Sequence, residues 1–219
     1  MRIIYNLLAL CFLLLCTTYS QEEAVSSNAP PSSLGLSADR SQEKRIEFLL
    51  EVAQAYSQSG DLQASIDAYE RILKMDPDHL QARYVLAQLY ITTKQYEKAE
   101  VTLLRLIKER PEDFTLLNNL AWLYATAEDP AIRDGQKAID YAQKAMVLAP
   151  NDHHVWSTLS EAYYVSGEYE KAYRAITHMA NLTVRSSQGV SEEAVEGYNE
   201  QIRKCQRALD TANAMKEDE

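Results

Sequence analysis

The sequence predicts an all-α fold built from stacked pairs of helices, because two series of residues share one period. The series are Tyr56, Tyr90, Tyr124 and Tyr163 for tyrosine, and Pro77, Pro111 and Pro150 for proline. Both series advance by one constant interval, which then lengthens by five positions before the last member. The shared interval of about 34 residues is typical of repeated helix–turn–helix units. The 219 residues include only 6 glycines and 6 prolines, so long stretches of the chain can stay helical.

Within each unit, the residues before the tyrosine define one face of a helix. An apolar residue precedes each tyrosine by four positions and a small residue precedes it by three, a spacing that shares one helical face. The apolar series is Val52, Leu86, Leu120 and Leu159, and the small series is Ala53, Ala87, Ala121 and Ser160. A second small residue follows nine positions after the tyrosine at Ser65, Ala99 and Ala172, and the third unit has Ala138, displaced by five. Small residues on both helices allow a close approach between them.

Turn signals mark the ends of the expected helices. Gly60 and Gly167 lie between the two helices of the first and fourth units. The three prolines end the second helix of the first three units, because a residue that precedes proline disfavours the helical conformation.

With these residues in place, the chain resembles tetratricopeptide-repeat (TPR) proteins, whose unit of about 34 residues is a helix–turn–helix. Trp156 occupies the bulky first position of the unit and Tyr69 the later aromatic position, whereas Ser65 and Val184 depart from the usual alanine and proline. The resemblance implies an α-solenoid of about four TPR units plus a C-terminal capping helix. The repeat domain would span residues 41–184, with units at 46–79, 80–113, 114–152 and 153–184.

Residues 1–20 have the plan of a secretory signal peptide. Arg2 precedes an apolar segment at residues 3–16, and small residues precede an expected cleavage point after Ser20. The alternative is an inner-membrane anchor formed by residues 3–16, although this segment is short for a membrane-spanning helix. Both alternatives predict export, to the periplasm or to the outer side of the inner membrane. Residues 21–40, rich in Ser, Pro and Ala, are expected to form a flexible linker.

The third unit is five residues longer than the first two, and the extra residues lie in a loop at 126–136. Asp129-Pro130 should end its first helix and Asp134-Gly135 should begin its second. The surrounding residues 120–138 are similar to a variant in exported bacterial TPR proteins. A lengthened turn held by Arg133 and Asp134 is favoured over a functional protrusion.

A last helix is expected at residues 191–215, where apolar residues recur at steps of three and four. The stripe consists of Val195, Tyr198, Ile202, Cys205, Leu209 and Ala212. Such a helix would cap the open end of a repeat stack, and pairing of two chains into a homodimer through the same stripe is the alternative. Cys205 is the only cysteine outside the predicted signal segment, so we expect no internal disulfide.

Charge and motifs exclude several functional classes. A net charge of −10, with no run of lysines or arginines, argues against nucleic-acid binding. The sequence has no glycine-rich phosphate loop and no motif around a catalytic nucleophile. The cluster Asp152-His153-His154 lies at a helix start, where adjacent side chains diverge, and we expect its histidines to face solvent. We therefore predict no enzyme activity, no cofactor, no metal site and no small-molecule substrate.

The resemblance implies that the first helices of the units line a concave groove that binds a protein or peptide partner. The groove positions carried over are mostly uncharged polar and aromatic residues, which suit the backbone of an extended peptide. They are Gln54, Gln58, Gln81, Tyr84, Gln88, Asn118, Asn119, Trp122, Ser157, Glu161 and Tyr164.

Trp122 is the expected anchor of the partner, because tryptophan dominates binding hot spots, whereas Trp156 is expected in the core. Asn118 and Asn119 disfavour the middle of a helix, so we expect a local benefit there; hydrogen bonds within the stack are the alternative explanation. The predicted function is a protein–protein interaction scaffold in the cell envelope. The alternative is a structural subunit of an envelope assembly, such as pilus or outer-membrane machinery, that uses the convex face or the last helix.

Overall fold

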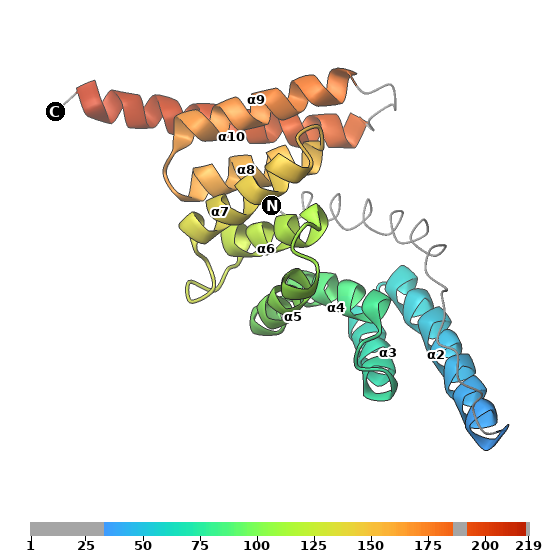
Figure 1. The fold of residues 1–219 in the computed structure, drawn as a ribbon. Coiled ribbons are helices and arrows are strands. Elements are labelled where there is room, and N and C mark those ends of the chain that lie inside the picture. The colour runs from blue at the N-terminus through green and yellow to red at the C-terminus, as the bar shows by residue number, and fades with distance from the viewer. Residues whose placement is uncertain (1–32, 186–191, 218–219) are drawn as a thin grey trace. The chain divides into compact units, whose positions relative to one another are not determined.

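The computed structural model describes residues 33–185 and 192–217, and every regular element in these ranges is an α-helix (Figure 1). The predicted all-α fold is therefore confirmed. The helices are α2 Ser33–Ser59, α3 Leu62–Met75, α4 Leu80–Thr92, α5 Tyr96–Glu109, α6 Phe114–Thr126, α7 Gly135–Leu148, α8 His153–Val165, α9 Tyr169–Arg185 and α10 Glu192–Glu217. Across the described ranges, no helix has both the length and the apolar character that a membrane span requires. The predicted signal segment at residues 1–20 lies outside the described residues.

The chain divides into two compact units, Met1–Thr93 and Lys94–Glu219. In the first unit α2 packs on α3, and α3 packs on α4. The crossing of α2 and α3 brings Ala53 and Ser65 together, both without solvent exposure. The Ser65 hydroxyl donates a hydrogen bond of 2.8 Å to the Ala53 carbonyl oxygen. Serine at this alanine position therefore keeps the close approach and satisfies its own hydroxyl.

The first helix begins earlier than the sequence predicts. Residues 33–40 belong to α2, although the composition of residues 21–40 predicts a flexible linker. No proline occurs between Pro31 and Pro77, so nothing in the sequence forces the helix to begin as late as Ser41. The predicted start of the helix rests on apolar periodicity. A helical extension that lacks this periodicity cannot be predicted in the same way.

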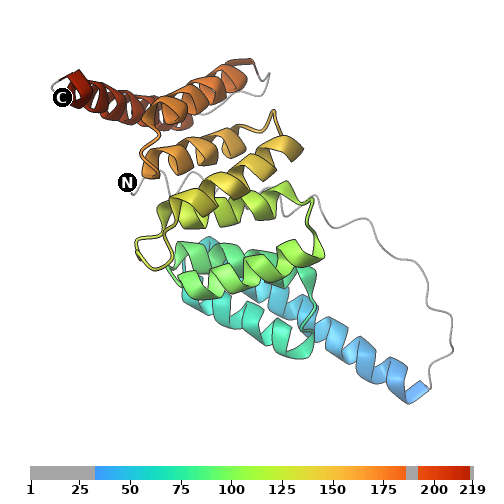
Figure 2. The same cartoon turned by 60° about the vertical axis from the view of Figure 1, so that its left-hand side comes forward.

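The second unit contains α5 to α10, with α6 on α7, α7 on α8, α8 on α9 and α9 on α10 (Figure 2). Three aspartates begin its helices, because their carboxylates accept hydrogen bonds from the free backbone N–H groups of the first turn. These residues are Asp113, Asp134 and Asp152. The crossing of α8 and α9 repeats the arrangement of the first unit, since the Ser160 hydroxyl donates to the Ala172 carbonyl oxygen at 2.8 Å.

The long turn of the third repeat lies between Thr126 and Gly135, as the sequence predicts. The backbone N–H of Asp134 donates to the carbonyl oxygen of Tyr124 at 3.0 Å, which fastens the end of the turn to α6. The Asp134 carboxylate accepts a hydrogen bond from the Lys137 N–H at 3.0 Å and so begins α7. Ile132 is 8% exposed, so the turn is anchored by an apolar side chain as well.

The periodic tyrosines link each helix pair to the helix before it. Tyr90 donates from its hydroxyl to the Glu70 carboxylate at 2.8 Å in the first unit, and Tyr124 donates to Glu100 at 2.7 Å in the second. Tyr163 accepts a hydrogen bond from the Gln143 amide at 3.0 Å. Tyr56 belongs to the first pair and is 41% exposed. The tyrosine series thus marks contacts between successive repeats, which explains why it shares the repeat period.

Candidate functional site

The first helix of the third repeat, α6, presents three polar groups on one face. Asn118 and Trp122 are four residues apart, and Asn119 is three residues from Trp122, so all three lie on one side of the helix. Asn118 is 8% exposed and Asn119 is 7% exposed, whereas Trp122 is half-buried. We call Asn118, Asn119 and Trp122 the α6 face.

None of the three side chains on the α6 face forms a hydrogen bond with any other described residue. The Asn118 side-chain oxygen is fully buried, and it accepts no hydrogen bond from this part of the chain. A buried polar group without a partner costs about 1–3 kcal/mol, so native proteins seldom leave one. In the described ranges, hydrogen bonding within the stack therefore does not explain the two mid-helix asparagines.

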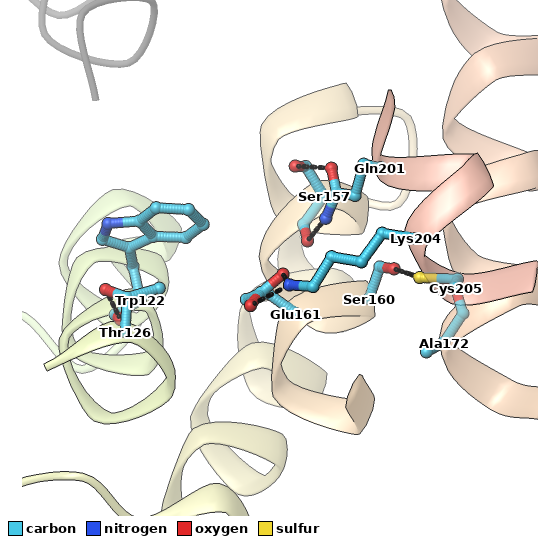
Figure 3. A network of polar contacts seen from close by, with 9 residues as sticks. All are labelled: Trp122, Thr126, Ser157, Ser160, Glu161, Ala172, Gln201, Lys204 and Cys205. Carbon is cyan, nitrogen blue, oxygen red and sulfur yellow. Dashed lines mark hydrogen bonds and ion pairs between the residues drawn. The ribbon is translucent and has the colours of Figure 1, made fainter. Parts of the chain in front are cut away.

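Trp156 and Trp122 are both half-buried, so the core position expected of Trp156 is not found, but the two tryptophans differ in their hydrogen bonds. The indole N–H of Trp156 donates to the Pro150 carbonyl oxygen at 2.7 Å, and its ring lies 4.2 Å from the His178 ring between centroids. The indole of Trp122 stands apart from the hydrogen bonds around it (Figure 3). Its backbone carbonyl accepts from the Thr126 hydroxyl at 2.8 Å, but its N–H meets no acceptor in the described part of the chain. Trp156 is thus held by the fold, whereas Trp122 keeps its hydrogen-bonding group available.

In the first unit, the predicted groove residues lie on α2 and α4. Gln54 and Gln58 on α2 are exposed. On α4, Gln81, Tyr84 and Gln88 are half-buried. All five side chains are at least partly exposed to solvent.

The last three predicted groove residues require a correction, because α10 covers them. Ser157 donates to the Gln201 side-chain oxygen at 3.2 Å, and Gln201 returns a hydrogen bond of 3.4 Å to the Ser157 carbonyl oxygen. Lys204 reaches Glu161 at 2.8 Å and lies 3.8 Å from the centre of the Tyr164 ring. Figure 3 shows the contacts of Ser157 with Gln201 and of Glu161 with Lys204, between α8 and α10. In this structure the chain's own helix therefore occupies the partner positions of the fourth repeat.

The capping role expected of residues 191–215 is seen in the way that α10 packs. Its stripe residues Tyr198, Ile202 and Cys205 join an apolar cluster with Ile176 and Met179 of α9. Cys205 is fully buried, and its thiol lies 3.7 Å from the Ser160 hydroxyl. Burial is the largest of the effects that raise the pKa of the Cys205 thiol. Cys205 therefore packs inside its own chain. The dimer alternative would need this part of the stripe to be exposed.

The histidine pair at the start of α8 is half-buried, which contradicts the expectation of solvent-facing rings. The rings of His153 and His154 lie 4.0 Å apart between centroids, and the Tyr198 hydroxyl of α10 lies 3.3 Å from His153 Nδ1. Burial and then the charge of His153 lower the pKa of His154 to about 4. His154 is therefore neutral at ordinary pH. No group of three or more potential metal ligands occurs in the residues that the structure describes.

Together, the repeated helix pairs and the available polar face on a first helix define a helical-repeat protein with a candidate binding surface. A family model described as a tetratricopeptide repeat matches residues 56–123. This match supports the TPR family for the repeat region, in agreement with the resemblance found in the sequence.

Three proteins of known name or structure are similar to part of this chain. Superkiller protein 3 of Schizosaccharomyces pombe is 24% identical over 129 residues, which cover 58% of this chain and 9% of that protein, so the chain spans only a small part of this relative. The solved structure of MamA 41-end from Desulfovibrio magneticus RS-1 is 25% identical, with a TM-score of 0.59, and the match covers 67% of this chain and 80% of that one. The O-GlcNAc transferase of Thermobaculum terrenum, in a mutant structure, is 24% identical with a TM-score of 0.55, over 65% of this chain and 27% of the enzyme. The similarity supports a protein-interaction scaffold, since TPR stacks expose extended binding surfaces.

Proposed function

We propose that this protein is a scaffold that holds a segment of a partner protein on the α6 face. One observation supports the proposal most strongly. The side chains of Asn118, Asn119 and Trp122 lie on one side of one helix, and none of them forms a hydrogen bond with another described residue. A carboxamide both donates and accepts hydrogen bonds, so it can pair with the N–H and C=O groups of an extended backbone. The proposal therefore favours an extended peptide segment over a small molecule.

The energetics favour binding at the same place. The fully buried Asn118 oxygen, which is unpaired within the described chain, costs the free protein about 1–3 kcal/mol, and a partner's donor would recover that cost if the side chain turns toward the surface on binding. The indole ring offers a large apolar surface with a polar edge, a combination that is common at the centre of interfaces. Binding would thus combine one apolar anchor with two or more directed hydrogen bonds.

The proposal also covers location and the absence of catalysis. The charged and apolar pattern of residues 1–20 supports export to the cell envelope, and the lack of a nucleophile motif or a phosphate loop in the sequence supports a non-enzymatic role. The partner would then be an envelope protein or a protein in transit through the envelope. Amino-terminal sequencing of the mature protein tests the predicted cleavage after Ser20.

A second candidate function is a structural subunit that assembles through its outer helices. It is favoured by exposed apolar side chains on α5 and α7: Val101 is 67% exposed, Leu104 40%, Val147 73% and Leu148 43%. The variant of this candidate that uses the stripe of α10 is disfavoured, because Cys205 is buried in its own chain.

Two tryptophan variants test the proposed binding face. Trp122→Ala should weaken capture of the partner from the native envelope fraction and leave the melting temperature nearly unchanged. Trp156→Ala should lower the stability instead, by about 1–2 kcal/mol, because it removes packing against His178 and the hydrogen bond to the Pro150 carbonyl oxygen. The proposal fails if Trp122→Ala destabilises the protein as strongly as Trp156→Ala, or if it leaves partner capture intact.

A further inference from the structure

A hollow between α2 and α3 of the first unit combines an apolar floor with a basic rim. Phe48, Leu49 and Met75 supply the apolar surface. The cations of the rim come from both helices and are Lys44, Arg45, Arg71 and Lys74. We call these seven residues the basic seam. A hydrogen bond of 2.9 Å from the Gln42 amide to the Met75 carbonyl oxygen ties the two helices together beside it.

The charge of the basic seam is opposite to that of the protein. The whole chain has 32 acidic and 22 basic residues, yet no carboxylate of the described residues lines this hollow. None of the four cations forms an ion pair within residues 33–185 or 192–217. Elsewhere in the described structure, exposed cations find carboxylates: Lys94 pairs with Glu128 at 2.6 Å, and Arg174 pairs with Glu170 at 2.6 Å. Four such cations around one hollow produce a local field that attracts negative charge.

The floor of the seam is exposed as well as apolar. Phe48 lies on the surface of α2 and is 64% exposed, and its neighbour Leu49 is half-buried. A large aromatic side chain loses favourable burial in this position. An exposed aromatic with apolar neighbours and a charged rim has the anatomy of an interface, in which an apolar centre is surrounded by polar groups.

We infer that the basic seam binds an acidic, amphipathic helical segment of a partner protein. The hollow runs between two helices, so it suits a third helix that lays apolar side chains at three- and four-residue steps onto Phe48, Leu49 and Met75. Carboxylates on both flanks of such a helix would face the cations of α2 on one side and those of α3 on the other. An anionic membrane surface fits less well, because a flat bilayer meets cations on a convex face more easily than an apolar floor in a hollow.

The signal escaped the sequence because its parts are distant in the chain. Lys44 and Arg45 are adjacent, but Arg71 and Lys74 belong to the next helix. No basic run is present, and only the pairing of α2 with α3 brings the four charges together. This surface lies in the first unit, whereas the α6 face lies in the second, so each can fail its test independently.

Fluorescence anisotropy on the full chain tests the inference with a labelled synthetic peptide long enough for about four helical turns. The peptide places leucine at positions 1, 4, 8 and 11 and glutamate or alanine elsewhere; a second peptide has the same composition in scrambled order. Arg71→Gln with Lys74→Gln should weaken binding of the patterned peptide about fivefold, since exposed ion pairs contribute modestly. Phe48→Ala should weaken it about tenfold, because the apolar anchor is lost. Circular dichroism checks that each variant remains helical.

The control pair is Lys108→Gln with Arg207→Gln, two exposed cations of the second unit that make the same change in net charge. It should leave binding unchanged. The inference is overturned if the control pair weakens binding as much as the seam pair, if the scrambled peptide binds equally well, or if Phe48→Ala has no effect. Sedimentation with phosphatidylglycerol vesicles forms the last arm: vesicle binding that needs Arg71 and Lys74, without peptide binding, would assign the seam to a membrane surface and refute the protein-segment inference.

Discussion

Removing the periodic tyrosine hydroxyls one at a time should cost stability only where the hydroxyl reaches the preceding helix. Tyr90→Phe and Tyr124→Phe each delete a hydrogen bond to a carboxylate, at 2.8 Å and 2.7 Å. Such bonds contribute up to about 3 kcal/mol, but Glu70 and Glu100 are half-buried and can regain water. We therefore expect a loss of about 1–1.5 kcal/mol for each variant. Tyr56→Phe should change the stability by less than about 0.5 kcal/mol, because its side chain is 41% exposed.

Hydrogen exchange followed by mass spectrometry is the assay, because it reports each helix separately. A loss of about 1.4 kcal/mol corresponds to tenfold faster exchange where opening is local. Tyr90→Phe should accelerate exchange in α3 and α4, and Tyr124→Phe in α5 and α6. Equal acceleration in Tyr56→Phe, or no acceleration in either of the other variants, would refute the conclusion that these hydroxyls join successive repeats.

The same tyrosines give a pH dependence with a defined sign. Burial first, and then the hydrogen bond to Glu70 or Glu100, raise the pKa of Tyr90 and Tyr124 well above the usual range. The folded state therefore favours the neutral phenol. This stabilisation is complete below the unfolded-state pKa of about 10, and it is lost as the pH rises toward the folded-state pKa. The difference in the free energy of unfolding between wild type and the Phe variants should therefore shrink as the pH rises above about 10.

Substitution or labelling of three individual residues gives further predictions. Asn118→Leu should stabilise the free protein by about 1–2 kcal/mol, because it removes a buried oxygen that lacks a described partner and a poor helix former, while it weakens partner capture; a destabilised protein in urea denaturation would contradict this. Gly135→Ala should destabilise the second unit by about 1–2 kcal/mol, since its Cβ would overlap Ser166 Oγ and lie 3.3 Å from Ser166 Cβ, and Ser166→Gly should restore part of the loss because it removes both atoms. Cys205 should react with a thiol reagent only after denaturation, and non-reducing gels should show no disulfide-linked dimer, because the thiol is fully buried; rapid labelling of the native protein would argue for an open stripe.

The sequence predicted those features of the fold that repeat along the chain. Tyrosine and proline spacing located the helix pairs, and Asp129-Pro130 with Asp134-Gly135 located the long turn, because caps and breakers act over a few residues. The early start of α2 at Ser33 escaped prediction, because residues 33–40 carry no apolar period. The turn at Lys94 escaped because no glycine marks it: its φ of 61° occupies the place where Gly60 has 84° and Gly167 has 77°.

The candidate site was predictable in part, because helix faces follow from spacing and contacts between distant helices do not. The resemblance to TPR proteins placed Asn118, Asn119 and Trp122 among the groove positions, and their spacing puts them on one face of α6. It could not show that Lys204 would pair with Glu161 across 43 residues, which removes the fourth repeat's positions from the open surface. The basic seam is likewise a product of tertiary packing, since its cations come from two helices.

Site-specific cross-linking tests the binding face most directly. A photoreactive benzoylphenylalanine at Thr126, one helical turn after Trp122, reports on α6, and the same residue at Val147 reports on the exposed surface of α7. Illumination of the cells that make the protein should give a partner adduct from position 126, and Trp122→Ala in the same chain should abolish it. Adducts from position 147 alone, or an adduct from position 126 that survives Trp122→Ala, would contradict the assignment of partner binding to the α6 face.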